Sequence, residues 1–172
     1  MKLDQNKNIA LIGFMGAGKS VAAKRLSGLL KKELISTDQY IEKKEGRPIA
    51  QIFAEEGEAR FRAMERAAVK EIGQKRNIII DCGGGIVLNP DNIRDLKKNS
   101  IIIYLSASPE MVLKRIKDHK HRPLINVPDP LGKIKELLAQ RLPLYEQADL
   151  TIDTDNKTNA AVCDEILDLL KK

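Results

Sequence analysis

The chain has 172 residues, of which 42% are hydrophobic, and a formal net charge of +6, so we expect one globular domain with an ordinary core. Two cysteines are too few for a disulfide framework, and no apolar stretch is long enough to cross a membrane. With three Phe, three Tyr, no Trp and dispersed basic residues, the composition favours small anionic ligands over nucleic acid.

Short apolar runs alternate with longer helical patterns along the chain. Strands are predicted at 8–13, 33–36, 77–82, 100–105 and 149–153. Helices are predicted at 19–31, 38–45, 49–55, 58–74, 90–97, 109–118, 131–146 and 158–171. The alternation predicts an α/β fold in three layers, a five-stranded parallel sheet flanked by helices, with ligands at the carboxyl ends of the strands.

A glycine-rich loop joins the first strand to the first helix. Residues 13–20 read Gly-Phe-Met-Gly-Ala-Gly-Lys-Ser and match the phosphate-binding pattern G-x-x-x-x-G-K-[ST]. The glycines let backbone N–H groups turn towards phosphate oxygens. Lys19 then reaches the β- and γ-phosphates, and Ser20 ligates Mg²⁺. The loop therefore predicts a bound nucleotide.

Polar residues and glycines follow the second and third strands. Asp38 either deprotonates an acceptor hydroxyl or caps the helix that follows. After Cys82, three consecutive glycines, Gly83–Gly85, make either a tight turn or the backbone floor of a ligand site. Both clusters fall where an α/β sheet binds its ligands.

Several arginines are candidate anion contacts, because the guanidinium group binds carboxylates and phosphates with two hydrogen bonds. Any one of them alone is typical of an exposed surface; they are Arg60, Arg62, Arg115, Arg122 and Arg141. Glu65 lies three residues after Arg62 on one helix face and is placed to hold its guanidinium group. The basic, proline-rich stretch 117–131 is either a surface loop or a mobile lid.

These pieces, in this order, resemble the shikimate kinase family. The resemblance rests on residues 11–20, 36–38, 52–65, 83–87, 122–125 and 140–148. Its most specific parts are Glu-Gly-Glu-Ala-Arg-Phe-Arg-x-x-Glu at 56–65, the triple glycine and Arg-Pro-Leu at 122–124. It implies a single P-loop kinase domain over 1–172, with a substrate-binding subdomain at about 38–65 and a lid at about 117–128. The implied reaction transfers the ATP γ-phosphate to the 3-hydroxyl of shikimate.

The resemblance also implies roles for individual residues. The implied ATP contacts are Gly16, Ala17, Gly18, Lys19, Ser20, Val21, Arg115, Arg122 and Lys157. The implied shikimate contacts are Asp38, Arg62, Gly83, Gly84, Gly85 and Arg141, with both arginines on the carboxylate. The implied catalytic residues are Lys19, Asp38 and Arg122, and Mg²⁺ at Ser20 is the implied cofactor.

Two departures from the family pattern concern this metal. The family has Asp-Thr-Asp where this chain has Ser36-Thr37-Asp38, so one carboxylate that reaches Mg²⁺ through water is missing. We hypothesise that Asp81 replaces it. Alternation along a strand argues against this, because Asp81 points away from the phosphates if Cys82 faces them.

Two alternatives compete with this interpretation. One is another small P-loop kinase, acting on gluconate or on a nucleoside monophosphate. The other is a nucleotide-dependent switch or a basic RNA-binding module without catalysis, which salt-sensitive RNA binding would reveal. The leading expectation is a cytoplasmic monomer whose partners are ATP and shikimate, with neither nucleic acid nor membrane.

Overall fold

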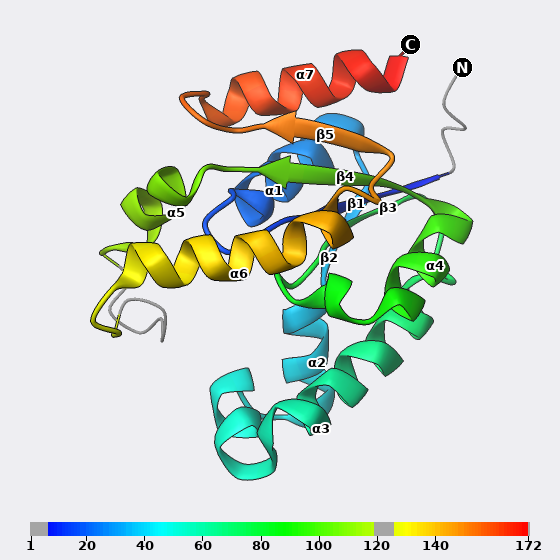
Figure 1. Ribbon diagram of the computed structural model, residues 1–172. Helices are drawn as coiled ribbons and strands as arrows, with labels where there is room; N and C mark the ends of the chain where they lie inside the picture. Colours follow the sequence, from blue (N-terminus) through cyan, green and yellow to red (C-terminus); the bar gives the residue numbers. More distant parts are fainter. Residues whose placement is uncertain (1–6, 119–125, 172) are drawn as a thin grey trace.

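The computed structural model describes residues 7–118 and 126–171, which form a three-layer α/β fold (Figure 1). The strands are β1 (Asn8–Ile12), β2 (Glu33–Ser36), β3 (Ile78–Asp81), β4 (Ser100–Ser106) and β5 (Leu150–Asp153). The helices are α1 (Lys19–Leu30), α2 (Thr37–Glu45), α3 (Ile49–Ile72), α4 (Pro90–Asn99), α5 (Pro109–Ile116), α6 (Pro130–Tyr145) and α7 (Asn159–Lys171), with a short 3-10 helix, η1 (Ile86–Leu88).

All five strands are parallel and lie in the order β2-β3-β1-β4-β5. The predicted fold class is therefore confirmed. β1 is central, with β3 and β4 on either side of it. The connection after β1 leads through α1 to β2 at one edge of the sheet, whereas the connection after its neighbour β3 leads through α4 to β4 on the other side of β1. The loops after β1 and β3 therefore separate and leave room for a ligand.

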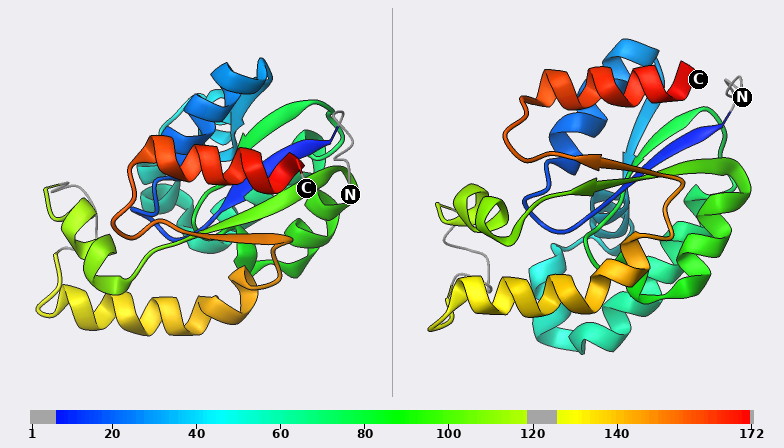
Figure 2. Two further views of the ribbon diagram at one scale, coloured as in Figure 1. Left: turned by 90° about the horizontal axis from the view of Figure 1, so that it is seen from above. Right: turned by 45° about the horizontal axis from the view of Figure 1, so that its top comes forward.

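Alternating side chains of β1 build the two cores of the molecule. Ile9 and Leu11 pack with α1 and α7, whereas Ala10 and Ile12 belong to the core beneath α3, α4, α5 and α6. Figures 1 and 2 accordingly show α7 on one side of the sheet and α6 on the other. Helix α2 and the first half of α3 project from the second side.

The predicted strand and helix boundaries lie within two residues of those observed, with one difference in connectivity. The helices predicted at 49–55 and 58–74 run on as α3, interrupted at Gly57, whose φ of 79° and ψ of 174° are not helical. Such a backbone conformation is accessible essentially only to glycine. The chain therefore changes direction at Gly57 without a loop, and α3 ends at Ile72. The η1 turn was not predicted.

Helix α2 begins with a serine cap rather than an aspartate cap. The Ser36 hydroxyl accepts a hydrogen bond from the Gln39 N–H at 3.3 Å. Asp38 lies in the first turn, so its carboxylate is not the cap. Of the two roles left open for Asp38, capping is thus excluded.

Candidate active site

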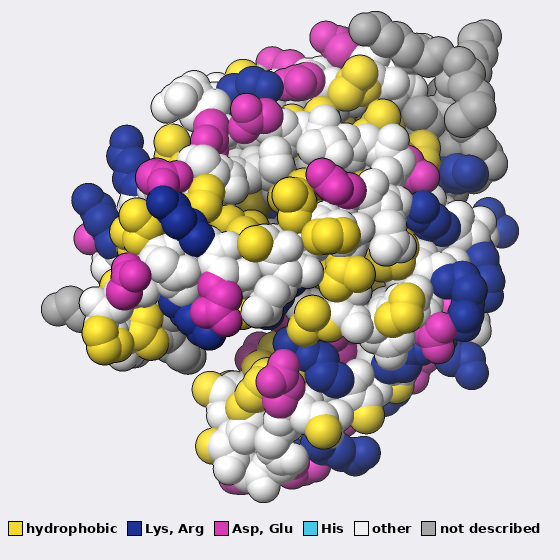
Figure 3. All heavy atoms as spheres, in the orientation of Figure 1, with side chains coloured by type: hydrophobic (Ala, Val, Ile, Leu, Met, Phe, Trp, Pro, Cys, Tyr) yellow, Lys and Arg dark blue, Asp and Glu magenta, His cyan; other side chains and the backbone are white. Residues whose placement is uncertain are grey.

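A cavity of about 300 Å³ lies at the carboxyl ends of β1, β2 and β3. The loop before α1, the start of α2 and the loop after β3 all contribute to its wall. The lining residues are Met15, Gly16, Gly18, Lys19, Ser20, Val21, Ser36, Asp38, Asp81, Cys82, Gly83 and Gly84. Figure 3 shows the surface hollowed where the projecting α2–α3 unit meets the body below α6.

The loop between β1 and α1 has a backbone that requires glycine at two tightly packed positions. Gly13 has a φ of 149°, and a Cβ atom there would lie 2.5 Å from the Leu105 carbonyl oxygen. Gly16 has a φ of 77°, and its Cβ atom would lie 2.9 Å from Cγ2 of Ile116. The loop is therefore clamped against β4 and α5 in a fixed shape.

The two polar side chains that follow the loop are both held at the cavity. Lys19 is only 9% exposed, and its Nζ donates a hydrogen bond to the Phe14 carbonyl oxygen at 3.0 Å. This contact folds the ammonium group back over the loop. Ser20 donates from Oγ to Oδ2 of Asp81 at 2.6 Å. A hydroxyl and a carboxylate thus meet beside the loop, and hard oxygen ligands of this kind suit Mg²⁺.

Asp81 points into the cavity because of the alternation along β3. Ile78, Ile80 and Cys82 belong to the core beneath α3 and α4, whereas Ile79 packs on the α1 side. Asp81 follows Ile79 by two residues and faces the same side. The sequence-based objection to Asp81 was wrong, because it assumed that the Cys82 side chain faces the phosphates.

Each of the three glycines after β3 meets a functional side chain from another element. A Cβ atom at Gly83 would lie 2.7 Å from Oδ1 of Asp38, and one at Gly85 would collide with the terminal nitrogens of Arg62. The Gly84 carbonyl oxygen accepts hydrogen bonds from Arg141 Nη1 at 3.4 Å and from the hydroxyl of Tyr145 at 2.7 Å. Gly83 to Gly85 therefore form a floor around which Asp38, Arg62 and Arg141 gather.

Asp38 lies in an environment that favours its protonated form. Burial raises the pKa of the Asp38 carboxyl, the negative charge of Asp81 raises it further, and Lys19 opposes both effects. A carboxylate whose pKa is raised is a stronger base once it is ionised. The position and the electrostatics of Asp38 both fit proton abstraction from a bound hydroxyl.

Arg62 is held by two carboxylates of its own helix. As expected from the sequence, Glu65 accepts hydrogen bonds from Nη1 with both oxygens, at 3.1 and 3.0 Å. Burial raises the pKa of Glu65, and the neighbouring guanidinium group opposes this shift. Glu58 also accepts from Arg62, a contact that the sequence analysis missed although the two residues are four apart on a helix.

The end of helix α6, which carries Arg141, is held in place by a pair of stacked aromatic rings. Tyr145 stacks on Tyr104 with ring centroids 4.9 Å apart, and the guanidinium group of Arg141 lies over the Phe14 ring at 5.5 Å. Burial raises the pKa of Tyr145 to about 12, so its hydroxyl remains a donor to Gly84. Tyr145 was not predicted as a site residue, but its spacing of four from Arg141 on a helix placed it on the same face.

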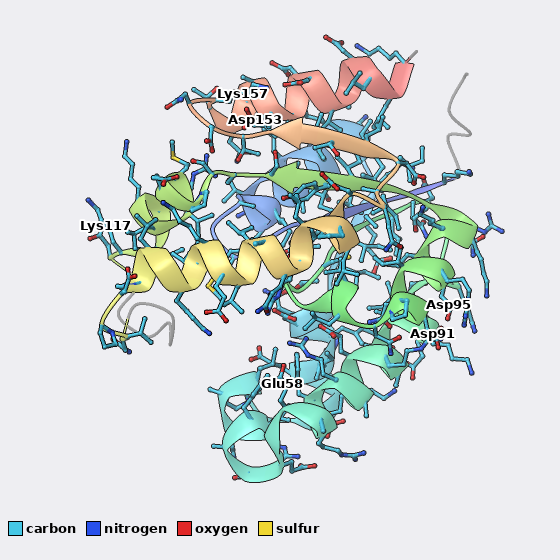
Figure 4. The ribbon with its side chains drawn as sticks, in the orientation of Figure 1. Glu58, Asp91, Asp95, Lys117, Asp153 and Lys157 are labelled. Atoms are coloured by element: carbon cyan, nitrogen blue, oxygen red, sulfur yellow. The ribbon has the colours of Figure 1, made fainter. Side chains whose placement is uncertain are left out.

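A second cavity of about 220 Å³ opens on the other side of the loop, between α1, α5 and the start of α7. Arg115 bridges its walls, donating to the Gly16 carbonyl oxygen at 3.1 Å and to that of Thr154 at 2.8 Å. Lys157 lies at the rim and pairs with Glu165 at 2.6 Å (Figure 4). The lining residues are Ala17, Gly18, Val21, Arg115, Thr154, Lys157, Asn159 and Val162, of which Thr154 and Val162 were not predicted.

One of the predicted arginines is not part of this arrangement. Arg60 pairs with Glu56 at 3.0 Å and lines a separate pocket between α2 and α3. Arg122 and the residues 119–125 of the predicted lid lie outside the described residues. In the described ranges 7–118 and 126–171, His, Cys, Asp and Glu form no group of three that could hold a metal ion, and no helix there is long and apolar enough to cross a membrane.

The chain is similar over nearly its whole length to proteins of one family. A family model described as shikimate kinase matches residues 15–171. The chain is 50% identical over 166 residues to a shikimate kinase of Dehalococcoides mccartyi, covering 96% of this chain and 94% of that protein. It is 45% identical to one of Pelotomaculum thermopropionicum, covering 96% of each. The solved structure of a shikimate kinase from Acinetobacter baumannii in complex with shikimate matches with a TM-score of 0.90 and 36% identity, over 96% of this chain and 93% of that one.

Proposed function

This chain belongs to the shikimate kinase family, and we propose that the residues around its central cavity carry out the reaction of that family. The chain is an ATP-dependent phosphotransferase that transfers the γ-phosphate to the 3-hydroxyl of shikimate, giving shikimate 3-phosphate and ADP for aromatic amino acid biosynthesis. The assignment of roles to individual residues rests on one observation. The loop Gly83–Gly85 brings a base and two arginines together beside a phosphate-binding loop.

We assign the acceptor to the floor formed by Gly83–Gly85. Arg62 and Arg141 bind the shikimate carboxylate, because two guanidinium groups suit one planar anion. Asp38 accepts the proton of the attacking hydroxyl. Holding the carboxylate at a fixed distance from Asp38 selects which hydroxyl faces ATP, and such positioning supplies much of the catalysis in phosphoryl transfer.

We assign the donor phosphates to the loop Gly16–Ser20. Their charge is neutralised by Lys19 and, in the proposed lid at about 117–128, by Arg122. The hydroxyl of Ser20 and the carboxylate of Asp81 fit Mg²⁺, which when bound neutralises charge on the phosphates. In this assignment Ser20 would ligate the metal, and Asp81 would hold it through water.

The adenosine part of ATP is assigned to the second cavity, against Val21, Arg115 and Lys157. We further propose that residues 38–65 act as a substrate-binding unit, which is supported by their projection from the sheet in Figure 1. The protein is proposed to act as a cytoplasmic monomer. Size-exclusion chromatography with light scattering tests the oligomeric state, and a mass well above 19.2 kDa would contradict it.

The function is tested by measuring ADP release from Mg·ATP with shikimate, gluconate or a nucleoside monophosphate as acceptor. We expect stimulation by shikimate alone, because shikimate holds its carboxylate and hydroxyls on one rigid ring, whereas gluconate is a flexible open chain and a nucleoside monophosphate has no carboxylate. A larger stimulation by gluconate or by a nucleotide would replace shikimate as the substrate. Salt-sensitive RNA binding without any acceptor-dependent turnover would favour a nucleic-acid-binding module instead.

The carboxylate assignment predicts a specific kinetic defect in Arg62→Ala. Losing a charged, bidentate contact should raise the KM for shikimate by about 10²-fold or more, while the KM for ATP changes little. Steady-state kinetics with each substrate varied in turn separates the two effects. An equal loss of ATP affinity would show that Arg62 does not act on the acceptor.

A further inference from the structure

The guanidinium group of Arg62 is engaged on every side. Its Nη1 donates to both oxygens of Glu65, and its Nε and Nη2 donate to Oε1 of Glu58 at 3.3 and 3.2 Å. Its terminal nitrogens pack against Gly85, and its carbon lies 5.2 Å from the ring centroid of Phe61. A carboxylate ligand that needs two parallel N–H donors can therefore use only the Nε–Nη2 edge, and Glu58 lies there.

The two carboxylates that hold Arg62 differ in how easily they are displaced. The Glu65 side chain is 1% exposed, so removing its partner would leave a buried charge unpaired. The Glu58 side chain is 63% exposed and returns to water when it leaves Arg62. Figure 4 shows Glu58 on the projecting helix, on the side turned towards the body of the molecule. Glu65 therefore stays paired with Arg62, whereas Glu58 can be exchanged for another carboxylate.

We propose that Glu58 occupies the acceptor-binding edge of Arg62 in the ligand-free enzyme and is displaced by the carboxylate of shikimate. This inference rests on the proposed function, which assigns Arg62 to that carboxylate. Binding then exchanges one carboxylate for another, so Arg62 stays paired throughout. An uncharged acceptor of the same shape would break the Glu58–Arg62 pair without replacing it. Glu58 is thus a specificity-determining residue that selects acids over neutral analogues.

The test is a double-mutant cycle of Glu58→Gln and Arg62→Ala, with kcat/KM for shikimate measured at saturating Mg·ATP and constant ionic strength. Glu58→Gln removes the competing charge but keeps the shape of the side chain. We expect it to raise kcat/KM and to lower the calorimetric Kd for shikimate by about two- to fivefold, the equivalent of one exposed ion pair. In the Arg62→Ala background the same substitution should have no effect.

A matched control is Glu56→Gln, which removes one charge from the same helix. Glu56 pairs with Arg47 and Arg60 rather than with Arg62. We expect its kcat/KM to equal that of the wild type. An equal gain in Glu56→Gln, or a gain from Glu58→Gln that persists without Arg62, would mean a general charge effect and would overturn the exchange. A weaker Kd in Glu58→Gln would mean that Glu58 prepares Arg62 for binding rather than competing with the ligand. If the wild type binds no shikimate, the proposed function itself fails, whereas an unchanged Kd in Glu58→Gln overturns only this inference.

Discussion

At the scale of single residues, the carboxylate beside Ser20 comes from β3, whereas β2 offers a hydroxyl at the neighbouring position. Ser36 on β2 and Asp81 on β3 are direct neighbours in the parallel register. The Ser36 hydroxyl caps α2, and the Asp81 carboxylate reaches Ser20. A negative charge lost at position 36 is thus present one strand away, on the same edge of the sheet.

This arrangement predicts that Asp81→Asn lowers the affinity for Mg²⁺ at the nucleotide site. Carboxylates that hold a metal through water typically contribute about 10–100-fold to its affinity. We therefore expect a rise of that order in the Mg²⁺ concentration needed for half-maximal tightening of ATP binding, measured by calorimetry without shikimate. An unchanged Mg²⁺ dependence would remove Asp81 from the metal site.

The matched variant is the exchange Ser36→Asp with Asp81→Asn, which returns the carboxylate to β2. Aspartate caps helices as well as serine does, so α2 should keep its start. We expect this double variant to recover most of the Mg²⁺ affinity lost in Asp81→Asn. Ser36→Ala serves as the control: it should cost about 1 kcal/mol of stability through loss of the cap.

The sequence predicted most of these residues but not all of their contacts. Asp38, Arg62 and Arg141 could be found because they belong to distinctive motifs. The direction of Asp81 could not, because it depends on which face of β3 packs under α1, and every neighbouring position in that strand is apolar. Glu58 pairs with a residue four positions away on its own helix, and that spacing is as common on ordinary surfaces. Tyr145 contacts Tyr104 and Gly84 on other elements, and the sequence does not indicate these pairs.

At the scale of elements, the fold was predictable because each helix and strand has its own pattern of apolar residues. Helix α3 was predicted as two helices with a break between them, and the backbone at Gly57 is indeed not helical. The angle at which the two helical segments meet was not predictable. The break at Gly57 precedes Glu58 directly. The backbone angle at Gly57 therefore sets the direction of the helical turns that carry Glu58 and Arg62. The local sequence predicts the break but not this direction.

Helices α3 and α4 are joined by an ion pair that makes a prediction about acid stability. Asp95 accepts from Arg66 Nη2 at 2.5 Å and from Lys98 Nζ at 2.7 Å. Hydrogen bonds from Lys98 and Arg66 lower the pKa of Asp95 to about 2 from its ordinary 3.8. A lowered pKa contributes stability above the unfolded value, and this stability is lost as the pH falls through about 2.

We expect Asp95→Asn to lower the free energy of unfolding by about 1 kcal/mol at pH 7, after allowance for solvent screening. The difference from the wild type should persist at pH 5 and roughly halve by pH 3, as urea titrations at each pH will measure. Asp91→Asn is the control on the same helix (Figure 4), because the Asp91 side chain is 46% exposed against 14% for Asp95 and pairs with the exposed Arg94. A loss that does not depend on pH would assign the effect to packing instead.

At the scale of the whole molecule, the excess of positive charge suits the binding of anionic substrates. The chain carries 30 basic and 24 acidic residues, and both proposed substrates are anions. The cations that line the two cavities or contact the loop Gly83–Gly85 come from α1, α3, α5, α6 and the loop before α7, which the sheet gathers at one edge. They are Lys19, Arg62, Arg115, Arg141 and Lys157. The net charge can be counted from the sequence, but only the topology explains why these cations are close to one another.

The positive electrostatic potential around these cations predicts how the kinetics respond to salt. Raising KCl from roughly 0.05 to roughly 0.5 M shortens the Debye length from about 14 Å to about 4 Å. We expect kcat/KM to fall for both substrates, and more steeply for Mg·ATP than for shikimate, because Mg·ATP carries more negative charge. The kcat at saturation of both substrates should change little, since the bound phosphates and carboxylate are shielded from the added ions. Equal slopes for the two substrates, or a fall in kcat alone, would show that salt acts on the chemistry or on the fold rather than on the approach of the anions.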